Sequence, residues 1–305
     1  MDFSSLHKNG YMIVPSVLDP TEQQELINGL WEHTELVTGK KVIRNDMTTW
    51  NAIKMLTPSH GMLMQHYHYG QCQATWNVRQ NPKVVNVFQE LYKTPNLLTS
   101  MDGVSFGLPS EFSRIGWHND GRKWFHIDQA LANNKFSGVQ GWVSANEVLP
   151  GDATLSVLEQ SHMLHESFAS EFGQQQNKTD WFKLTDIQVQ WYKNKGCREI
   201  EITCPAGSLV LWDSRTVHYG KGPTKGRRQA STRYVVYVCM APKQECSNTI
   251  LKKRMKLFNE GRMTTHWPLK AKTFPKYPNT YGKKNHPIYN FCPPILSDLG
   301  KSLIA

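Results

Sequence analysis

Short apolar segments separated by turn-forming residues dominate the middle of the chain, and they restrict its fold more than any other feature. They lie at residues 97–106, 139–146, 154–159, 199–203, 209–212 and 232–240. Gly, Pro and Asp interrupt the sequence between them, and many short strands with such punctuation are typical of an all-β barrel or jelly roll. We therefore predict a mainly β core from about residue 97 to residue 242.

Helical patterns flank this core. Asp19-Pro20-Thr21-Glu22 offers a helix start, with Asp at the cap, Pro in the first turn and Glu three residues after the cap. A short strand at 11–14 precedes it, and a second helix is predicted to begin at Asn81-Pro82.

The rest of the chain completes a single predicted domain over residues 1–305. Its parts are a helical N-terminal part (1–95), the β core (about 97–242) with a helical insertion (162–195), and a C-terminal helix with a basic tail (247–305). Within that tail, residues 268–296 are rich in Pro and Lys and show little periodicity.

Composition excludes several classes of protein. The 305 residues are 39% hydrophobic and 11% aromatic, which indicates a globular chain, and no apolar run approaches the roughly 20 residues of a membrane helix. The N-terminus lacks the apolar stretch of a signal peptide, so we expect a cytoplasmic protein. None of the six cysteines forms a Cys-x-x-Cys pair, which argues against zinc-ribbon and thioredoxin-like sites and favours reduced thiols.

The net charge of +10 suits an anionic partner. Much of the excess lies between residues 252 and 284 and forms no compact patch interleaved with aromatic residues. We therefore expect a small anionic substrate in preference to nucleic acid, and no membrane partner. The sequence does not indicate an oligomeric state.

A candidate metal site begins with His126-Ile127-Asp128. In a strand, residues two apart point to the same side, so His126 and Asp128 can reach one ion. His218, after the apolar segment 209–212, is the best third ligand. Two histidines and one carboxylate leave coordination positions open, as iron(II) oxygenases require for a keto acid and dioxygen. A second pair, His118 and Asp120, lies a few residues earlier, and spacing alone does not choose between the two pairs.

A dicarboxylate co-substrate needs a fixed cation inside the core. Arg233 lies in the otherwise apolar segment 232–238, where a guanidinium is costly unless it meets an anion. Its planar fork suits a carboxylate. Arg227 and Arg228 belong to a loop that we expect to face water, so Arg228 is the reserve candidate.

Several motifs together resemble the phytanoyl-CoA dioxygenase family, and in particular a branch found in fungi and algae. They are Asn9-Gly10-Tyr11-Met12-Ile13-Val14-Pro15, His126-Ile127-Asp128-Gln129, Val139-Gln140-Gly141, Glu159-Gln160-Ser161-His162, Trp212-Asp213-Ser214-Arg215-Thr216-Val217-His218-Tyr219-Gly220 and Tyr237-Val238-Cys239-Met240-Ala241-Pro242. The resemblance spans most of residues 8–267. It implies a double-stranded β-helix core (jelly-roll, cupin-like), iron(II), 2-oxoglutarate as co-substrate, dioxygen, and ascorbate as an assay supplement.

Carried over residue by residue, the resemblance makes His126, Asp128 and His218 the metal ligands, because Gln129 and the Val-Gln-Gly motif follow the first pair as they do in that branch. Arg233 matches the arginine that binds 2-oxoglutarate. It also implies that Gln140 contacts the keto acid, with a purely structural amide as the alternative. Trp117-His118-Asn119-Asp120 resembles the Trp-His-x-Asp motif of the wider family and remains the rival pair. Glu159-Gln160 departs from the usual Pro-Gly, which affects a turn, and His162 is expected to be structural.

The substrate is constrained less. Polar or cationic candidates for the mouth of the site are His66, His68, Arg79, Ser105, Arg114, His118 and Arg122. They favour a small carboxylated substrate. Algal members of the family include kainoid synthases, so the sharpest hypothesis is oxidative ring closure of an N-prenylated glutamate. The alternatives are simple hydroxylation of an amino acid or acyl derivative, or a metal-binding jelly-roll protein without catalysis.

Overall fold

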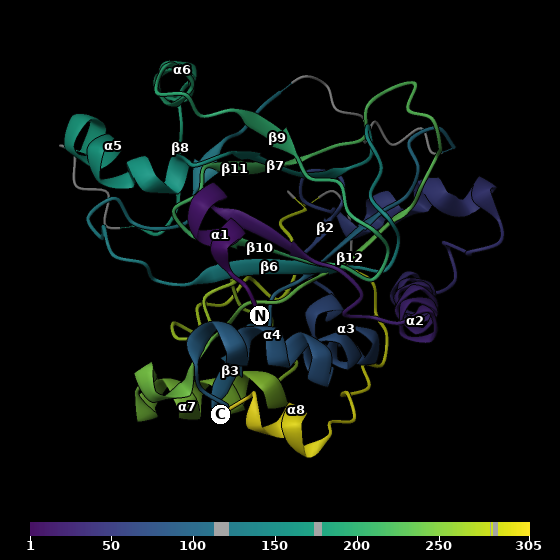
Figure 1. Cartoon of the computed structure of the whole chain (residues 1–305). Coiled ribbons are helices and arrows are strands. Elements are labelled where there is room, and N and C mark those ends of the chain that lie inside the picture. Colours follow the sequence, from purple (N-terminus) through teal and green to yellow (C-terminus); the bar gives the residue numbers. More distant parts are fainter. Residues whose placement is uncertain (113–121, 174–178, 281, 283–285) are drawn as a thin grey trace.

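Two antiparallel sheets form the core of the computed structural model, which describes residues 1–112, 122–173, 179–280, 282 and 286–305. The larger sheet has the strand order β1-β10-β6-β12-β4-β2, and the smaller has the order β8-β5-β11-β7-β9. A separate pair joins β13 to β3. This is the predicted jelly-roll core with flanking helices (Figure 1).

The strands of the larger sheet are β1 (Tyr11–Val14), β2 (Leu63–Met64), β4 (Val104–Gly107), β6 (Val139–Ser144), β10 (Leu209–Asp213) and β12 (Arg233–Tyr237). Those of the smaller are β5 (His126–Ile127), β7 (Thr154–Leu158), β8 (Phe182–Lys183), β9 (Glu199–Glu201) and β11 (His218–Lys221). The pair consists of β3 (Leu97–Thr99) and β13 (Met240–Pro242).

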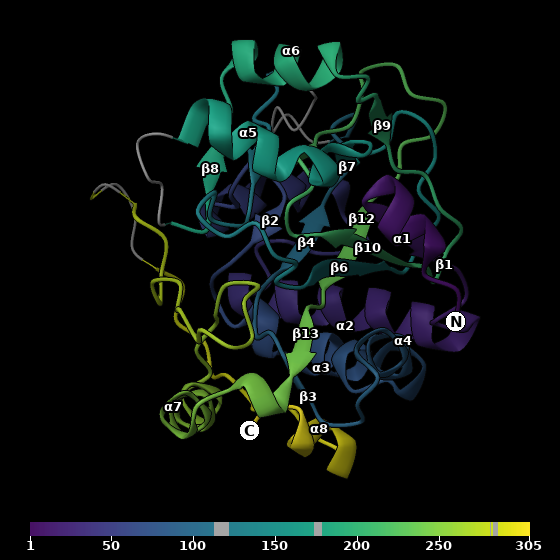
Figure 2. The same ribbon diagram turned by 60° about the vertical axis from the view of Figure 1, so that its left-hand side comes forward.

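The helices are α1 (Ser4–Asn9), α2 (Pro20–Thr38), α3 (Gln73–Arg79), α4 (Pro82–Tyr92), α5 (His165–Phe172), α6 (Asp186–Asn194), α7 (Asn248–Asn259) and α8 (Asp298–Ser302). Short 3-10 turns are η1 (Met47–Leu56), η2 (Tyr69–Gln71), η3 (Ser161–Leu164) and η5 (Lys243–Glu245). We call α2, α3, α4, α7 and α8 together with β3 and β13 the helical layer. It lies beneath the larger sheet, while α5 and α6 lie beyond the smaller one (Figures 1 and 2). None of the described helices is long and apolar enough to cross a membrane.

Local chemistry explains where the first helices begin. The Asp19 side chain accepts from the Glu22 backbone N–H while Glu22 reaches back to the cap, which completes the capping box predicted for α2. Asn81 caps α4, with Pro82 in its first turn. Both helix starts are therefore confirmed.

Two predicted strands are wrong in extent, because the chain changes sheet partway through each. The segment 97–106 divides into β3 and β4 around Gly103, where an added Cβ would lie 2.2 Å from the Met64 carbonyl oxygen. The segment 232–240 divides into β12, in the larger sheet, and β13, which pairs with β3. Apolar residues continue through the second break, at Val238-Cys239, so the sequence pattern gave no sign of it. The first break contains Asp102-Gly103, a turn signal that the predicted strand ran across.

Strand β6 shows how the larger sheet separates a core from a cavity. Val139 and Val143 pack in the same apolar cluster as side chains of the helical layer. Gln140 and Trp142, the alternate residues, line a cavity on the opposite face. All six side chains of the strand are buried, so both faces of the sheet are covered.

The six cysteines are free thiols, as predicted. Cys72, Cys197, Cys204 and Cys239 are buried, Cys246 is half-buried, and Cys292 is exposed.

Candidate metal centre

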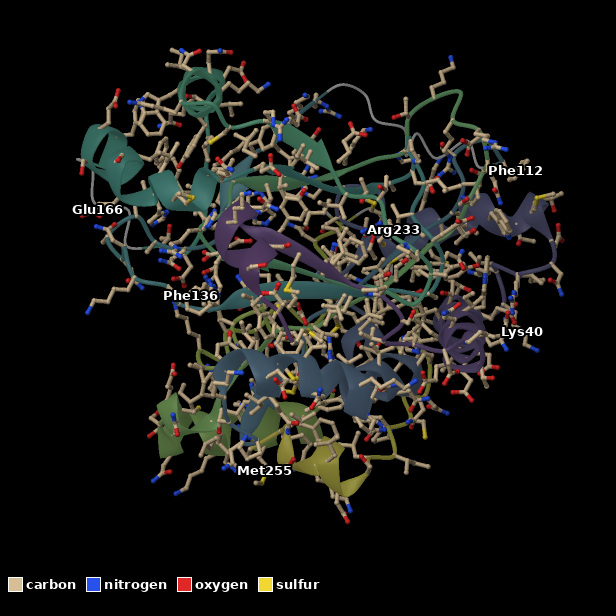
Figure 3. The ribbon with its side chains drawn as sticks, in the orientation of Figure 1. Lys40, Phe112, Phe136, Glu166, Arg233 and Met255 are labelled. Atoms are coloured by element: carbon tan, nitrogen blue, oxygen red, sulfur yellow. The ribbon has the colours of Figure 1, made fainter. Side chains whose placement is uncertain are left out.

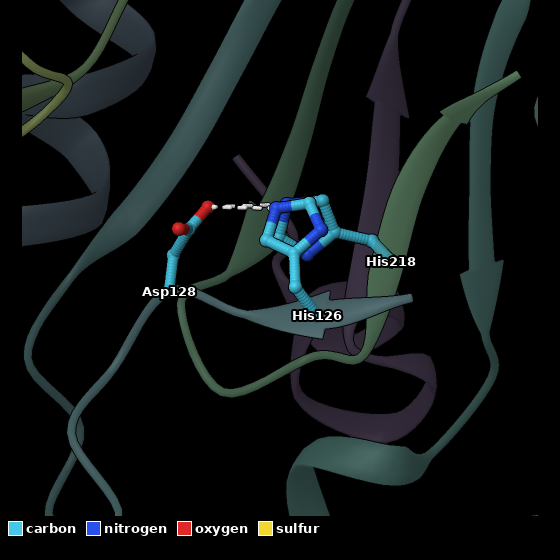
Figure 4. Close-up of side chains that lie close together, drawn as sticks. All are labelled: His126, Asp128 and His218. Carbon is cyan, nitrogen blue, oxygen red and sulfur yellow. Dashed lines mark ion pairs between the residues drawn. The ribbon is translucent and has the colours of Figure 1, made fainter. Parts of the chain in front are cut away.

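His126 and His218 face one another across neighbouring strands of the smaller sheet. The two residues are direct partners in the antiparallel pairing of β5 with β11, and their ring centroids lie 4.2 Å apart. Asp128 follows His126 by two residues, just beyond the end of β5. Its Oδ2 lies 3.4 Å from His126 Nε2 and 3.3 Å from His218 Nε2 (Figure 4). All three side chains are buried, and their candidate ligand atoms lie within 4.8 Å of one another. Among the residues that the structure describes, they form the one such group of three.

The other ring nitrogen of each histidine is held by the backbone. His126 Nδ1 lies 3.2 Å from the Trp124 carbonyl oxygen, and His218 Nδ1 lies 2.8 Å from that of Thr216. A carbonyl only accepts, so each Nδ1 carries the proton and donates it. Each Nε2 therefore keeps its lone pair and directs it toward Asp128, which is how histidines that bind metals are usually oriented. The donor set fits a divalent metal with open coordination positions.

The protonation states agree with metal binding. Burial alone would raise the pKa of Asp128, but the neighbouring His266 and His126, together with the close contacts that His126 and His218 make with the carboxylate, hold it well below its ordinary value. Burial lowers the pKa of His218, and His126 lowers it further, against the opposing effect of Asp128. The site thus combines an ionised carboxylate with a neutral imidazole, which are the ligand forms that a metal requires.

Gln140 supports the carboxylate from the opposite sheet. Its Nε2 donates to Asp128 Oδ2 over 2.9 Å, and it lies opposite Trp212 in the pairing of β6 with β10. The amide therefore restricts the orientation of Asp128. Gln140 also lines the cavity, and its predicted contact with a keto acid remains a prediction.

A cavity of about 420 Å³ lies between the two sheets and contains the metal centre. Its walls carry many aromatic side chains, which are His60, Trp124, Trp142, Trp181, Trp212, Tyr237, His266, Trp267 and Phe274. The cavity is therefore a largely apolar chamber with the metal ligands on one wall.

Arg233 lies at the start of β12 and also borders this cavity. Its Nε donates to Ser105 Oγ over 3.0 Å, its Nη1 donates to the Ala153 carbonyl oxygen, and its Cζ lies 5.2 Å from the centre of the Trp142 ring. Burial lowers its pKa, although Tyr237 and other neighbours oppose this. In Figure 3, Arg233 is labelled within the outline of the molecule, away from the other labelled residues. The residue is half-buried, and two hydrogen bonds hold its guanidinium at the border of the cavity. Its binding of the co-substrate remains a prediction.

The loop arginines differ from one another. Arg228 is exposed, as expected. The expectation for Arg227 is wrong, because its side chain is only 2% exposed and forms ion pairs with Glu111 and Asp152. Its charge is neutralised within the protein, so it offers little to a co-substrate.

Most of the predicted mouth residues serve the structure of the protein. Arg79 is completely buried and donates to backbone carbonyls and to Asp102, so its assignment to the mouth is wrong. His66 and His68 hold the C-terminal tail through the Pro275 carbonyl oxygen and the Tyr289 hydroxyl.

The remaining predicted residues of the mouth are Ser105, Arg114, His118 and Arg122. Ser105 accepts from Arg233 and is completely buried, while Arg122 is exposed. Arg114 and the rival ligand pair His118 and Asp120 lie outside the described residues. His162 contacts the His7 carbonyl oxygen, in agreement with the structural role expected of it.

Two groups of cavity residues were missed by sequence reasoning. Trp124 stacks between His60 and His126, with interplanar angles of 2° and 3°, and its Nε1 donates to the Gly220 carbonyl oxygen. Its position two residues before His126 could have indicated a shared face. The second group, at residues 265–274, falls in a region without periodicity, so no pattern marked it.

Comparisons with known proteins agree with this geometry. Residues 6–230 match the family model described as phytanoyl-CoA dioxygenase. The "Ava biosynthesis cluster protein O" of Aspergillus versicolor is 26% identical over 276 residues, which cover 86% of this chain and 84% of that protein. A putative oxidoreductase from Salmonella typhimurium LT2 has a similar fold, with a TM-score of 0.60 at 12% identity over 98% of this chain and 81% of that one.

A further solved structure is that of the epimerase SnoN in complex with Fe3+, alpha ketoglutarate and nogalamycin RO, with a TM-score of 0.48 at 16% identity over 78% of this chain and 81% of that one. The region matched by the family model includes His126, Asp128 and His218, and it ends before Arg233.

Proposed function

The chain belongs to the phytanoyl-CoA dioxygenase family and is an iron(II)- and 2-oxoglutarate-dependent oxygenase, and we propose that it oxidises a C–H bond of a small carboxylated substrate. In this proposal His126, Asp128 and His218 hold the iron, and Arg233 holds the co-substrate. The observation that carries it is the convergence of two Nε2 atoms on one carboxylate, with both Nδ1 atoms fixed by backbone carbonyls.

Arg233 supplies what the far carboxylate of 2-oxoglutarate requires. A guanidinium can bind a carboxylate through two parallel hydrogen bonds, and such pairs are strong where water is excluded. Ser105 and Ala153 fix the guanidinium from one side, so that the arginine is oriented before the co-substrate arrives. Trp142 and Trp212 add buried indole N–H groups that have no partner in the described part of the chain, and in this proposal they donate to the same ligand.

When bound, iron(II) and 2-oxoglutarate supply, with dioxygen, the oxidising power that breaks a substrate C–H bond. The residues of this chain contribute position and exclusion of water. Gln140 holds Asp128 in one orientation, and Trp124 packs flat against His126. The aromatic walls keep the chamber dry, which limits side reactions.

The sharpest form of the proposal is oxidative ring closure of an N-prenylated glutamate. Aromatic walls suit an isoprenoid chain, and the cationic side chains bordering the cavity suit carboxylates. Ring closure removes two hydrogens from the substrate, which leave in water. Simple hydroxylation would insert one oxygen atom instead.

Anaerobic titration tests the metal and co-substrate sites. Addition of iron(II) and 2-oxoglutarate should give the weak visible charge-transfer band of a bidentate keto acid on iron(II). The band should disappear in His126→Ala and His218→Ala, and persist in His118→Ala and in the control His7→Ala, whose side chain is exposed. Loss of the band in His118→Ala but not in His126→Ala would assign the ligand role to the rival pair.

Mass spectrometry tests the reaction. With N-prenylated L-glutamate, ring closure gives a product lighter by two hydrogens, and hydroxylation gives one heavier by one oxygen. Release of succinate from 2-oxoglutarate with iron(II) and ascorbate, in the absence of any substrate, separates an oxygenase from a metal-binding protein without catalysis. If neither succinate nor an oxidised product forms while the metal is bound, the proposal is wrong.

A further inference from the structure

Residues 264–274 form a strap that closes one side of the cavity. Its two arms meet at an isolated β-bridge between Thr264 and Thr273, and the Thr265 backbone N–H donates to the Lys272 carbonyl oxygen over 2.8 Å. The strap lies wholly beyond residue 230, where the match to the family model ends. It is therefore a part of the cavity wall that the matched segment does not include.

The strap is firmly attached to the helical layer. Thr264 exchanges two hydrogen bonds with the backbone of Met101, at 2.9 and 3.1 Å. Arg254 donates to the Pro268 carbonyl oxygen over 2.8 Å, and Arg262 donates to that of Phe274 over 3.0 Å. Its position is thus set by the core, as is required of an element that recognises a ligand.

Three residues of the strap that line the cavity carry buried polar atoms without a partner among the described residues. Thr265 Oγ1, His266 Nε2 and Trp267 Nε1 are buried, and none has a hydrogen bond within the part of the chain that the structure describes. All three residues line the cavity. A buried polar atom without a partner costs about 1–3 kcal/mol, so three in succession indicate a ligand that completes them. The indole N–H can only donate, and therefore that ligand must present acceptor atoms.

The balance of charges around the cavity indicates the charge of this ligand. In the loaded site, the charges of iron(II) and Arg233 balance those of Asp128 and the two carboxylates of 2-oxoglutarate. The other acidic side chains on the wall, Asp102 and Asp180, are paired with Arg79 and Lys270. Lys272 also borders the cavity and forms no ion pair with any residue in the described ranges. Leaving the imidazoles aside, Lys272, which is exposed, thus adds one positive charge at the border of the cavity that no acidic side chain of the wall offsets among the described residues.

We propose that this strap is the recognition element for the primary substrate, and that it binds a carboxylate of that substrate between Lys272 and the donors of Thr265 and Trp267. The inference rests on the proposed function and makes it more specific, since it assigns one anionic group of the substrate to residues outside the 2-oxoglutarate site. The ring of Trp267, with Phe274 and Trp181, provides the apolar surface for the rest of the molecule. The substrate class is therefore an acid that joins a carboxylate to an apolar, unsaturated or aromatic group.

The test compares phenylacetate with phenylacetamide, which have the same shape and differ in charge. Binding is followed by tryptophan fluorescence in the anaerobic protein saturated with iron(II) and 2-oxoglutarate. Because hydrogen bonds to charged groups are stronger than those to neutral ones, phenylacetate should bind about tenfold more tightly than the amide. In Lys272→Met the affinity for phenylacetate should fall about tenfold, and the preference for the acid should disappear. Thr265→Val should weaken phenylacetate binding severalfold.

Matched measurements separate this inference from its premise. Lys276→Met, which removes a nearby lysine outside the cavity wall, should leave both affinities unchanged. The charge-transfer band and the Kd for 2-oxoglutarate should be the same in Lys272→Met as in the wild type. Equal affinity for acid and amide in the wild type, or an unchanged preference in Lys272→Met, would overturn the inference even if the band forms. Absence of the band in the wild type would instead contradict the proposed function.

Discussion

Beneath the larger sheet, most buried polar side chains of the helical layer have hydrogen-bond partners among the described residues, with Thr99 Oγ1 as an exception, whereas the cavity above the same sheet buries several polar atoms that have no partner there. Arg254 of α7 is completely buried, and its guanidinium donates to the carbonyl oxygens of Thr99, Pro268, Leu303 and Ile304. In the cavity, the unpartnered atoms belong to Trp142, Trp212, Thr265, His266 and Trp267.

The difference separates residues that stabilise the fold from residues prepared for a ligand. Arg254 and Arg233 are both interior arginines, and burial lowers the pKa of each, that of Arg254 to about 10. Burial alone therefore does not identify a binding site. The distinguishing feature is where the N–H groups point, because those of Arg254 are directed at backbone carbonyls and the guanidinium of Arg233 borders the cavity. The N–H groups of Arg254 find their acceptors when the protein folds, whereas we propose that the guanidinium of Arg233 pairs with a carboxylate only when a ligand binds.

The largest effect is expected from Arg254→Met. This change removes a donor from four buried carbonyl oxygens, of which that of Leu303 also accepts from the Thr99 backbone N–H, and it detaches the strap from α7. The free energy of unfolding should fall by about 3–5 kcal/mol, as when one partner of a buried charged network is removed. Denaturant unfolding measures it, with the exposed neighbour Lys253→Met as the control. A loss below about 1 kcal/mol would show that the carbonyls find water or other donors.

Arg233→Met should give the opposite result. Its unfolding free energy should fall by only about 1–2 kcal/mol, because the guanidinium donates to two protein oxygens, Ser105 Oγ and the Ala153 carbonyl, and not to four carbonyls as Arg254 does. The Kd for 2-oxoglutarate should rise about 100-fold, which corresponds to the cost of removing one partner of a buried charge pair. Calorimetric titration of the iron(II) protein measures this change, and Arg228→Met, an exposed arginine of the adjoining loop, should leave the Kd unaltered. A stability loss as large as that of Arg254→Met would remove the distinction between the two arginines.

Much of the fold followed from the sequence because local signals and burial agreed. The caps at Asp19 and Asn81 marked helix starts, and apolar segments with turn residues between them marked most strands of the larger sheet but only β7 and β9 of the smaller one. The short strands β2, β5, β8 and β11 lie outside the predicted segments. Strand β5 has only two residues, too few for a period to be visible. The division at 97–106 coincides with the turn signal Asp102-Gly103, which the prediction passed over. The division at 232–240 depends on which sheet each half joins, and a local pattern holds no such information.

The candidate site was predictable where spacing determines geometry. The two-residue period of a strand placed His126 and Asp128 on one side, and the structure brings His218 to them from the adjacent strand. The choice over His118 and Asp120 depended on the family resemblance and remains a prediction. Arg79 was misplaced because its partners, Gly70, Asp102 and Tyr237, are brought to it only by tertiary packing. The strap was missed for the same reason, since its cavity-facing residues follow no regular period.

The helical layer should also lose stability in acid. His33 of α2 is buried, its Nε2 lies 2.9 Å from the Tyr67 carbonyl oxygen, and burial lowers its pKa to about 4. At a pH between the unfolded pKa of about 6.5 and the folded pKa, the His33 side chain is protonated in the unfolded chain and neutral in the folded protein. The unfolding free energy should therefore fall as the pH decreases from 6.5 to 4, with a contribution from His33 of about 1.4 kcal/mol per pH unit.

Denaturant unfolding at several pH values tests this contribution. In His33→Gln the amide can donate to the same carbonyl without titrating, so the slope should decrease by about one proton. His68, whose pKa is also lowered to about 4 by burial, continues to titrate in both proteins and cancels in the difference. Parallel pH profiles for the two proteins would show that His33 becomes protonated without unfolding.

The smallest effect is expected from a pair of Trp→Phe substitutions, one in the helical layer and one in the cavity wall. This pair compares the two regions most directly, because it removes the same atoms from each. Trp76 of α3 donates its Nε1 hydrogen to Gln71 Oε1 over 2.8 Å, whereas the buried Trp142 Nε1 has no partner among the residues that the structure describes. In the protein without ligands, Trp76→Phe should destabilise more than Trp142→Phe by about 1–2 kcal/mol, the cost of leaving a buried acceptor unpaired. Trp142→Phe should instead weaken 2-oxoglutarate severalfold, while Trp76→Phe leaves that affinity unchanged. If both variants lose equal stability, the indole N–H of Trp142 is satisfied in solution, and the unpartnered atoms of the cavity no longer indicate a ligand.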